Sequence, residues 1–566
     1  MTGPVWWTPN AFVGDISALD LQGSIWAYWW SAFSLEQGLN PFEGTHNYFP
    51  VGQEPVSQFN ILDGLLSAPL VWVFGLRTGF NLACVVILAT AGWGMRQLSL
   101  FLGLSSFSAT ASGVALMGSS YILQEMGSGR PTQALVVFFL LGLVGVGRIV
   151  TNQGAGKTVL GLGLCVAALG LVYWYYLPLF ALAALLVCLN HRESVGLAAL
   201  RRGMVSLALA AAVLMPFVLV LTQQYEELPG VERAAATDHV LFDRARGDFG
   251  MQMAIEDSEW PIWPLVSTPK AESRTLSWTV LALAVWGIAG RFRRERNLLV
   301  AVFVLGWLMS LGPYLKLGSE VPTSIPLPFL WMHDHLPFMD RFWWPHRWEL
   351  LCAIGASGLA GLGVQRLVQS GAIRAWPQQL AVVGLLVLGS VATRGGGLSM
   401  SELPRSSSEL YAGVDGPILS VPIGGDSLTG GLVLLTQTVH QRPITGGLGQ
   451  HLPGHRPAEM DAWMQESSLM QLLLSLEGGD SATVTVSPED VEALVDRGLR
   501  YAVLDPYNFD SVMSSRWVAS YAAVYWTLFG EPVRIHEGGA VWRIRAMDEP
   551  VDVHYGFATR PDRRLR

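Results

Sequence analysis

Charged side chains are scarce in this sequence. Of its 566 residues only 14% are charged, whereas 51% are hydrophobic. Soluble domains carry about a quarter charged residues, so this shortage excludes a purely soluble globular chain. Residues 79–222 form a nearly continuous series of apolar runs, whereas residues 395–566 have the mixed polarity of a globular domain. The composition therefore predicts an integral membrane protein that ends in a soluble domain.

A basic surface and paired cysteines are also missing. The net charge is −8 and is spread over loops and the C-terminal region, so we expect no nucleic-acid partner. All the cysteines fall inside predicted membrane helices, where a thiol behaves as a small apolar group: Cys84, Cys165, Cys188 and Cys352. The soluble domain therefore contains no disulfide, even if it is exported. Residues 1–15 lack the basic start and apolar core of a cleavable signal peptide.

Apolar segments long enough to cross a bilayer recur along the chain. A spanning helix needs roughly 17 to 25 mostly apolar residues. The predicted spans are 79–98, 107–124, 132–150, 158–173, 175–190, 203–222, 276–291, 297–314, 347–365 and 378–394. The sequence thus predicts a polytopic α-helical membrane protein with about 10 to 11 spans, the eleventh candidate being residues 60–76. That segment is either a span or a helix in the membrane interface, and its Pro69 and short apolar length favour the interface.

Basic residues indicate how the spans are oriented. Four connections rich in arginine lie on one side if residues 158–173 and 175–190 are separate spans: 148–157, 192–202, 291–296 and 366–374. Because Arg and Lys accumulate in short cytoplasmic loops, that side is predicted to be cytoplasmic. Loops 125–131, 223–275 and 315–346 are then outside, together with everything after Arg394. With residues 60–76 in the interface, residues 1–58 are outside as well. If that segment spanned the membrane, they would be cytoplasmic.

Three regions follow from these patterns. Residues 1–78 form a first outer loop with juxtamembrane helices, residues 79–394 form the membrane domain, and residues 395–566 form an extracytoplasmic domain. In the last region, residues 417–422, 483–486, 501–504 and 540–544 are predicted strands, and 457–477, 488–498 and 514–529 are predicted helices. This alternation is typical of a small α/β domain. The sequence of this region contains no nucleophile elbow, glycine fingerprint or paired catalytic residues, which favours a binding or structural role for the domain.

Three groups of residues could carry chemistry. Asp15 and Asp20 precede a tryptophan-rich helix, and Glu125 and Arg130 occupy a short outer loop. Residues 333–348 combine histidine, aspartate and arginine with aromatic side chains. Each group has a structural alternative: a polar loop beside an aromatic belt, a capped turn, or an interfacial belt with arginines that reach toward water. The functional alternatives are a general base or cation ligand, and a pocket for an anionic lipid-linked ligand.

Other motifs do not support a site. Residues 154–158 end like a phosphate-binding loop, but Thr151 stands where that motif needs glycine, and a membrane helix follows. His333 and His335 lack a closely spaced third metal ligand, and the histidines after residue 439 are too loosely spaced for a zinc site. Charges are nearly absent from the spans, which disfavours a transporter.

The order of several short motifs resembles the bacterial group of GT-C-like membrane proteins, relatives of polyprenyl-phosphate-sugar-dependent glycosyltransferases. The motifs are Gly14-Asp15 with Trp26 to Trp30, Asn40-Pro41-Phe42 and Pro50-x-Gly52; Leu311-Gly312-Pro313; Leu336-Pro337 through Arg341, Pro345 and Arg347; and Leu419 to Pro422, His440 to Gly446 and Gly498 to Leu504. The resemblance covers nearly the whole chain. Proteins of this group begin with a membrane helix before the acidic loop, whereas only 14 residues precede Asp15 here. Either the protein starts upstream of these residues, which we favour, or the first loop is exported without a leading helix.

The resemblance implies roles for individual residues. Asp15 would be the general base or metal carboxylate, and Glu125 the second acidic group, both as catalytic and as metal-binding residues for a divalent cation such as Mg or Mn. The candidate substrate-binding residues are Arg130, Arg341, Arg347, His346 and Asp20. The implied partners are the lipid bilayer and a polyprenyl-phosphate-linked sugar, and no protein partner is indicated.

Two functional hypotheses follow. The first is an enzyme of the bacterial cytoplasmic (inner) membrane that transfers a sugar from a lipid-phosphate donor to an extracytoplasmic acceptor, with inversion by direct displacement. The second is a non-catalytic membrane scaffold or assembly subunit whose exported domain binds a partner. The GT-C-like group includes proteins without demonstrated activity, so that fold alone does not choose between them.

Overall fold

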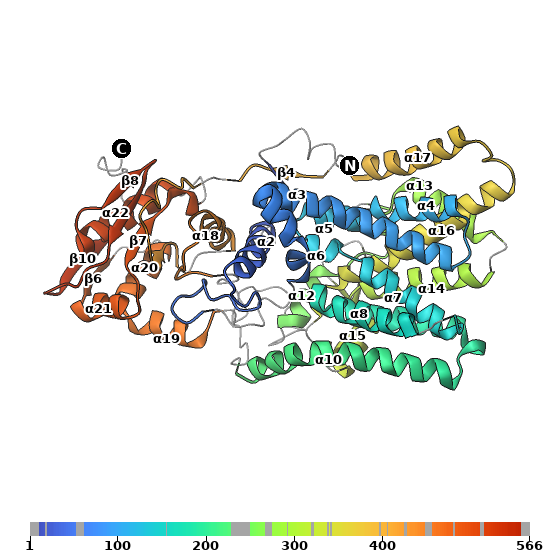
Figure 1. Ribbon diagram of the computed structural model, residues 1–566, viewed down its shortest axis with the longest axis horizontal. Coiled ribbons are helices and arrows are strands. Elements are labelled where there is room, and N and C mark those ends of the chain that lie inside the picture. Colours follow the sequence, from blue (N-terminus) through green and yellow to red (C-terminus); the bar gives the residue numbers. More distant parts are fainter. Residues whose placement is uncertain are drawn as a thin grey trace. The chain divides into compact units, whose positions relative to one another are not determined.

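The computed structural model divides the chain into two compact units. Unit 1 consists mainly of residues 81–225 and 230–400, and unit 2 mainly of residues 10–80 and 401–566 (Figure 1). The structure describes residues 11–16, 20–52, 61–153, 156–227, 249–266, 274–290, 293–317, 322–336, 339, 342–394, 398–403, 406–423, 427–447, 456–478, 482–509 and 514–555.

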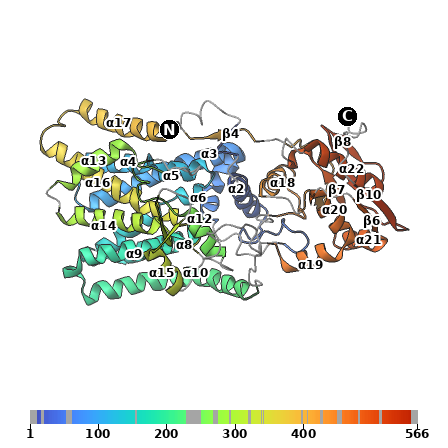
Figure 2. The same cartoon turned by 180° about the vertical axis from the view of Figure 1, so that it is seen from behind.

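Unit 1 is helical and contains a short β-hairpin. Its helices are α3 (Leu62–Phe101, from residue 81 on), α4 (Ser106–Met117), α5 (Ser120–Gly127), α6 (Pro131–Ala134), α7 (Val137–Val150), α8 (Gly156–Tyr173), α9 (Tyr176–Asn190), α10 (Leu197–Glu227), α12 (Phe249–Asp257), α13 (Trp278–Ile288), α14 (Arg293–Ser310), α15 (Pro328–His335), α16 (Glu349–Gln369) and α17 (Trp376–Arg394). Short 3-10 helices lie at Arg192–Ser194 and at Pro345–Trp348 (η4), and strands β2 (Tyr314–Lys316) and β3 (Pro322–Pro326) pair antiparallel. Figure 2 shows the same helices from behind.

The predicted polytopic helical fold is confirmed, with differences in individual helices. Each predicted span overlaps a helix, and six described helices are long and apolar enough to cross a membrane: Leu62–Phe101, Pro131–Val150, Gly156–Tyr173, Leu197–Val220, Pro345–Gln369 and Trp376–Thr393. The prediction of one helix over residues 107–124 is wrong, because the chain breaks at Gly118 and the Ser119 side chain caps the next helix by accepting from the Ile122 N–H. Helix α13 covers only eleven residues of the predicted span 276–291.

Helix α16 packs against α4, α13 and α14 through small residues. A Cβ on Gly363 would lie 2.1 Å from the Leu283 carbonyl oxygen, and one on Gly287 would lie 2.2 Å from the Leu359 carbonyl oxygen. Lipid tails supply no hydrophobic force between helices, so membrane helices associate through such close backbone approach. The glycines of this region therefore fix the position of α16, and with it the residues that precede α16.

The four basic connections come together at one end of unit 1. The Arg202 guanidinium donates to the Asn152 side chain at 3.4 Å, Arg294 donates to the Asn190 carbonyl at 2.8 Å, and Arg366 donates to the Trp286 carbonyl at 3.1 Å. Each of these contacts links one basic connection to another, or to the end of the helix beside it. Helix α16 ends beside this basic end, and its 21 residues extend about 30 Å at 1.5 Å per residue. Its first residue, Glu349, therefore lies at the opposite end of unit 1.

Helix α3 is really two helices joined by a sharp bend. Its backbone leaves the helical region at Gly75, where φ is 75° and ψ is 163°. A Cβ on Gly79 would lie 2.7 Å from the Val71 Cα, a contact that a straight helix cannot make between residues eight apart. Residues 62–74 are too short to span a bilayer, whereas residues 76–101 are long enough. The bend supports the interfacial interpretation of residues 60–76.

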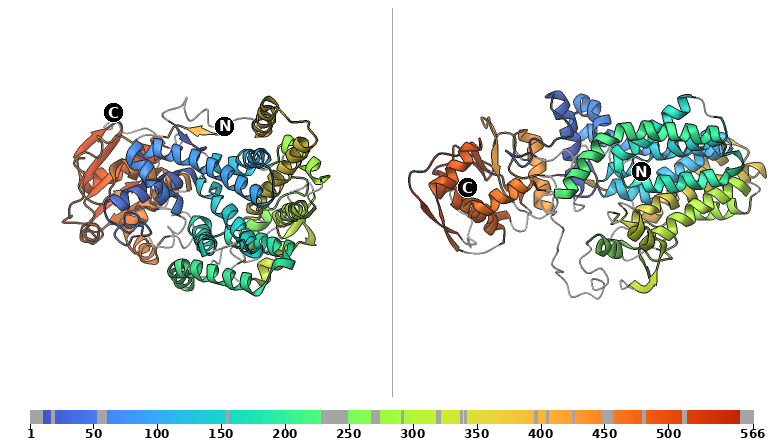
Figure 3. Two further views of the ribbon diagram at one scale, coloured as in Figure 1. Left: turned by 45° about the vertical axis from the view of Figure 1, so that its right-hand side comes forward. Right: turned by 90° about the horizontal axis from the view of Figure 1, so that it is seen from below.

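Unit 2 contains the predicted α/β domain. Its main sheet has the strand order β5-β7-β9-β8, formed by β5 (Ile418–Ser420), β7 (Tyr501–Leu504), β9 (Gly539–Arg543) and β8 (Arg534–His536). Strands β5 and β7 are parallel and the other neighbours are antiparallel. Strands β6 (Ala482–Val486) and β10 (Val551–Tyr555) form a second pair. The helices are α2 (Asp20–Glu36), α18 (Ser427–His440), α19 (Ala458–Glu466), α20 (Ser468–Gly478), α21 (Pro488–Asp496) and α22 (Ser514–Phe529), seen from two further directions in Figure 3.

The N-terminal segment belongs to the same unit as this domain. Tyr48 is fully buried in the core that also contains Leu419 and Trp542. The backbone N–H groups of Tyr48 and Phe49 donate to the carbonyls of Gly446 and Ile444 at 2.8 and 2.9 Å. The Trp26 indole donates to the Gln437 side chain at 2.7 Å, and both side chains are buried. Residues 11–52 are thus a structural part of unit 2, although the sequence predicted them as a separate outer loop.

Candidate functional site

The candidate site of unit 1 is built around Glu125 on the short helix α5. Ser119 caps the start of this helix, and Gly129 turns the chain after its end with a positive φ of 73°. The turn returns the Arg130 N–H to the Glu125 carbonyl at 2.8 Å. This tight return brings the side chains of residues five apart within reach of each other. The loop of residues 125–131 therefore presents Glu125 and Arg130 as a pair.

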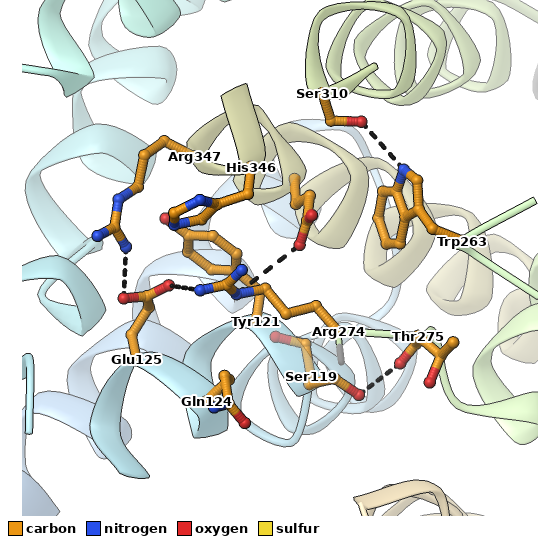
Figure 4. A network of polar contacts seen from close by, with 12 residues as sticks. Ser119, Tyr121, Gln124, Glu125, Trp263, Arg274, Thr275, Ser310, His346 and Arg347 are labelled. Atoms are coloured by element: carbon orange, nitrogen blue, oxygen red, sulfur yellow. Dashed lines mark hydrogen bonds and ion pairs between the residues drawn. The ribbon is translucent and has the colours of Figure 1, made fainter. Parts of the chain in front are cut away.

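Three arginines surround the Glu125 carboxylate. Arg130 Nε lies 2.7 Å from Oε2. Arg347 Nη1 lies 2.5 Å from the same oxygen, and Arg274 Nη2 lies 3.0 Å from Oε1 (Figure 4). The Glu125 side chain is completely buried, and the side chains of Arg130, Arg274 and Arg347 are 12%, 3% and 5% exposed. We refer to these four residues together with Glu349 as the Glu125 cluster.

The Glu125 cluster contains more positive than negative side chains. Arg274 Nε also lies 3.8 Å from the Glu349 carboxylate, so three guanidinium groups face two carboxylates. Arginine stays protonated in proteins, and the cluster therefore has a net charge of about +1 if both carboxylates are ionised. A buried group of charges is stable only when each charge is paired and hydrogen-bonded.

The arginines determine the ionisation of Glu125. Burial raises the pKa of the Glu125 carboxyl, but the positive charges of Arg130, Arg347 and Arg274 lower it more, and the resulting pKa is well below the ordinary value. Glu125 is therefore ionised at every pH at which the protein would work. A carboxylate with such a low pKa is a poor general base, because proton transfer is most efficient when the pKa is near the working pH.

Further residues hold the cluster in place. The Ser120 hydroxyl donates to the Thr275 carbonyl at 2.5 Å, which fixes the segment that carries Arg274 against α5. His346 Nδ1 lies 2.6 Å from the Asp257 carboxylate, which also accepts from the His346 backbone N–H at 3.0 Å. The start of η4 is thereby bound to α12. Because Arg347 follows His346, this contact positions the Arg347 side chain toward Glu125.

The other predicted site residues have different surroundings. Asp15 lies in unit 2, where its side chain is exposed. The Ser401 hydroxyl accepts from the Ile16 N–H and donates to the Gly14 carbonyl, both at 2.9 Å, so the backbone on both sides of Asp15 is held. Asp20 is exposed at the first position of α2. Arg341 lies outside the described residues. Unit 1 thus brings together Glu125, Arg130 and Arg347, with His346 beside them.

Sequence reasoning missed Arg274, Glu349 and Asp257. Arg274 closes the predicted outer loop 223–275, and Glu349 follows the motif of residues 333–348 by one position. A charged residue at the membrane boundary of an outer loop was the only available signal, and it is a weak one because such residues are usually solvated. Their pairing with residues 75 to 149 positions away could not be read from spacing.

The predicted divalent cation does not fit Glu125 in this arrangement. Both carboxylate oxygens contact guanidinium groups, and three positive charges repel a cation. Among the described residues no group of three or more His, Cys, Asp and Glu side chains could hold a metal ion. Asp15 therefore stays the predicted metal carboxylate if a cation takes part, and Glu125 has the geometry of an arginine anchor.

Comparisons with known proteins concern the architecture. No protein-family model matches the chain, and no curated protein matches its sequence. Among solved structures, the chain is similar to the archaeal oligosaccharyltransferase AglB from Archaeoglobus fulgidus in complex with an inhibitory peptide and a dolichol-phosphate, at 10% identity and a TM-score of 0.45. The match covers 88% of this chain and 66% of that one, so the chain spans slightly less than two thirds of that protein's length.

Two more structures give a similar result. The apo form of the Archaeoglobus fulgidus oligosaccharyltransferase matches at 10% identity and a TM-score of 0.45, over 98% of this chain and 74% of that one. ArnT from Cupriavidus metallidurans, also in the apo state, matches at 12% identity and a TM-score of 0.33, over 86% and 91% of the two chains. The predicted GT-C-like resemblance is confirmed as a likeness. Its scores are too low to carry an argument about substrate or mechanism, so the function is argued from the residues of this chain.

Proposed function

We propose that this protein is a membrane glycosyltransferase that transfers a sugar from a lipid-phosphate donor to an acceptor outside the cytoplasm. The observation that supports it most is the Glu125 cluster, in which one buried carboxylate holds three arginines. Guanidinium groups match the geometry of phosphate oxygens, and a fixed arginine loses less freedom on binding than a mobile one. In the proposal, the guanidinium groups of Arg130 and Arg347 bind the donor phosphate.

The position of the cluster agrees with an outer active site. It lies at the end of unit 1 opposite the basic connections, because α16 starts at Glu349 in the cluster and ends beside Arg366. The positive-inside rule predicts that the basic connections are cytoplasmic. We therefore propose this orientation in the cytoplasmic membrane of a bacterium, with the cluster at the extracytoplasmic surface. It would there meet a lipid whose phosphate lies at the membrane boundary.

The proposed reaction needs a base and a stabilised leaving group. The acceptor hydroxyl oxygen attacks the anomeric carbon of the sugar, while the bond from that carbon to the donor phosphate oxygen breaks and the phosphate leaves with the electron pair. Direct displacement inverts the anomeric carbon. We assign the removal of the acceptor proton to Asp15, which is exposed on a held backbone. We assign Arg130 and Arg347 to the charge of the leaving phosphate.

The exposed carboxylate of Asp15 gives the first test. The Asp15→Asn variant is expected to lose sugar transfer by at least about 100-fold, since a positioned general base contributes about 10² to 10⁴ in rate. The measurement compares the glycans and lipids of membranes from cells that carry the wild-type protein, the variant or no protein, by mass spectrometry. Glu43→Gln is the matched control, because Glu43 is an acid of the same segment that is bonded to Asn40 at 2.7 Å.

Retention of full activity by Asp15→Asn would exclude the assigned role of Asp15. If the null cells also show no change in any glycan or lipid, the catalytic proposal is lost and the scaffold hypothesis is preferred. Protein amount and melting temperature are compared in the same membranes, because an exposed side chain should alter neither.

Arg130 provides a test of phosphate binding. It is the most exposed arginine of the cluster, so its replacement should disturb folding least. We expect Arg130→Gln to weaken binding of polyprenyl monophosphate by about 10- to 100-fold, the size of one charge-assisted hydrogen bond. The affinity of Arg130→Lys should lie between those of the wild type and Arg130→Gln. Lysine keeps the positive charge but lacks the paired N–H groups with which a guanidinium binds two phosphate oxygens. The measurement is calorimetric titration of the purified protein in detergent. Equal affinity in all three proteins would rule out phosphate binding by Arg130.

A further inference from the structure

A groove on unit 2 has the features of a lipid site, and it is separate from the Glu125 cluster. The groove has a volume of about 550 Å³ and lies between α2, the first half of α3 and the end of α18. Its apolar lining includes Trp29 and Phe33 from α2 and Trp72 and Leu76 from α3. This volume lies within the range of about 300 to 1,000 Å³ that small-molecule sites occupy.

The walls of the groove are held in place by contacts within unit 2. The rings of Trp29 and Phe33 stack with their centroids 4.9 Å apart and an interplanar angle of 19°. The Trp72 indole donates to the Ala32 carbonyl at 3.1 Å and thereby ties α3 to α2. A site that is already formed binds more tightly, because little side-chain freedom is lost on binding.

The groove is next to a surface that suits the membrane interface. Residues 62–74 of α3 expose several large apolar side chains: Leu66 (57%), Trp72 (51%), Val73 (72%) and Phe74 (52%). After the bend at Gly75, Leu76 begins the part of α3 that is long enough to span the bilayer. A short helix with exposed tryptophan and phenylalanine that leads directly into a span is expected to lie among the lipid headgroups. Since Leu76 also lines the groove, hydrocarbon chains of the bilayer can reach it.

The polar part of the lining indicates the headgroup. Glu36 is exposed and is the only charged residue among those that line the groove in the described part of the chain. Thr438, at the end of α18, and Gln441, the residue after this helix, are neutral. The Gln441 amide can donate to phosphate or ester oxygens, whereas the Thr438 hydroxyl already donates to the Leu435 carbonyl at 2.7 Å. A negative rim repels an anionic lipid and attracts an ammonium group. A carboxylate also accepts hydrogen bonds from the primary ammonium group of ethanolamine, whereas the quaternary group of choline has no N–H to donate. The charge of the groove is thus opposite to that of the arginines proposed to bind the donor phosphate.

We propose that this groove binds a phospholipid with an ethanolamine headgroup, one acyl chain lying against Trp29, Phe33 and Leu76 and the ammonium group next to Glu36. The lipid is a constituent of the membrane and takes no part in sugar transfer. Its role is to fix unit 2 at the bilayer surface. Lipid binding in the groove therefore does not depend on the proposed enzymatic function.

Filling the groove tests the proposal. The full-length protein is placed in nanodiscs of equal parts phosphatidylcholine, phosphatidylethanolamine and phosphatidylglycerol, transferred to detergent and examined by native mass spectrometry. The wild type should retain phosphatidylethanolamine in preference to the other two lipids. Thr438→Trp should lower that bound lipid by about tenfold, because the indole occupies the space of the chain. Val439→Trp is the control: Val439 is the adjacent β-branched residue, is 38% exposed and does not line the groove.

The headgroup is tested at Glu36. Glu36→Lys should shift the preference from phosphatidylethanolamine to phosphatidylglycerol by about fivefold, the effect of one surface charge pair. Unchanged lipid binding in Thr438→Trp overturns the site, as does an equal loss in Val439→Trp, which would mean an unspecific lipid layer. An unchanged preference in Glu36→Lys overturns the assignment of the headgroup. Melting temperatures of all variants in one detergent show that the loss of lipid does not come from unfolding.

Discussion

Replacing Glu125 with alanine is expected to destabilise the protein by about 3 to 5 kcal/mol, the usual cost of leaving buried charges without their partner. The substitution removes the carboxylate that contacts Arg130, Arg274 and Arg347. Arg274 and Arg347 are 3% and 5% exposed and would keep their charges in a site that water barely reaches. The variant should therefore melt far below the wild type in detergent, with unfolding followed by the near-ultraviolet signal of the tryptophans.

Two further variants separate the charge from the shape of Glu125. Glu125→Gln keeps the size of the side chain and removes its charge, so it should be almost as unstable as the alanine variant. The double variant Glu125→Leu with Arg274→Met also removes one of the buried arginine charges. It should recover only a small part of the stability, because Arg347 still loses its carboxylate and Glu349 loses Arg274. A wild-type melting temperature for Glu125→Gln would contradict the idea that this carboxylate anchors the arginines.

The same cluster gives stability a definite dependence on pH. The folded-state pKa of Glu125 lies below its value in the unfolded chain of about 4.3. A lowered folded-state pKa means that the unfolded chain binds the proton more readily, so stability rises with pH through this region. The contribution of Glu125 is therefore complete above the unfolded-state pKa and is lost as the pH falls below it. The Glu125→Gln variant should not lose this contribution on acidification, because its side chain does not titrate.

The fold was largely predictable where local patterns are strong. Helix α22 has the predicted bounds of 514–529, and strands β6, β7 and β9 lie within one residue of their predicted bounds. One predicted helix over residues 457–477 is instead two, because Ser467 and Ser468 turn to bond with Asp490 of α21. That break depends on a partner 22 residues away. The bend at Gly75 could be suspected from the glycine alone, but the contact of Gly79 with Val71 could not.

The candidate site was predictable in part for the same reason. The pairing of Glu125 with Arg130 follows from one short loop, and the motif of residues 333–348 drew attention to Arg347. Arg274 and Asp257 contact their partners across 149 and 89 residues and have no local motif. Its position in a predicted outer loop and the GT-C-like resemblance also suggested a cation ligand at Glu125, where the structure has three arginines. Identity of a residue is visible in sequence, whereas the charge of its surroundings depends on the tertiary fold.

Replacing Tyr48 is also expected to have a large effect on stability. Its ring is fully buried in the core of unit 2, and a Cβ on Gly447 would lie 2.4 Å from that ring. The Tyr48 backbone has a positive φ of 49°, a conformation that costs roughly 1 to 2 kcal/mol for a residue with a side chain. Burial of the ring offsets this cost. Tyr48→Ala is therefore expected to destabilise unit 2 by about 3 to 5 kcal/mol, as for other large aromatic groups removed from a core.

The residues that become unstable in Tyr48→Ala show whether the N-terminal segment and the C-terminal domain fold together. In the full-length protein, Tyr48→Ala should increase proteolysis within residues 401–566. Tyr48→Phe should have a much smaller effect because it keeps the buried ring. Cleavage sites are identified by mass spectrometry after brief protease treatment. If cleavage in Tyr48→Ala increased only within residues 11–52, the segment would be an appendage. Increased cleavage in the C-terminal domain would mean that the segment carrying Asp15 and this domain share one core. Mutations in the domain would then also change the position of Asp15, the proposed base.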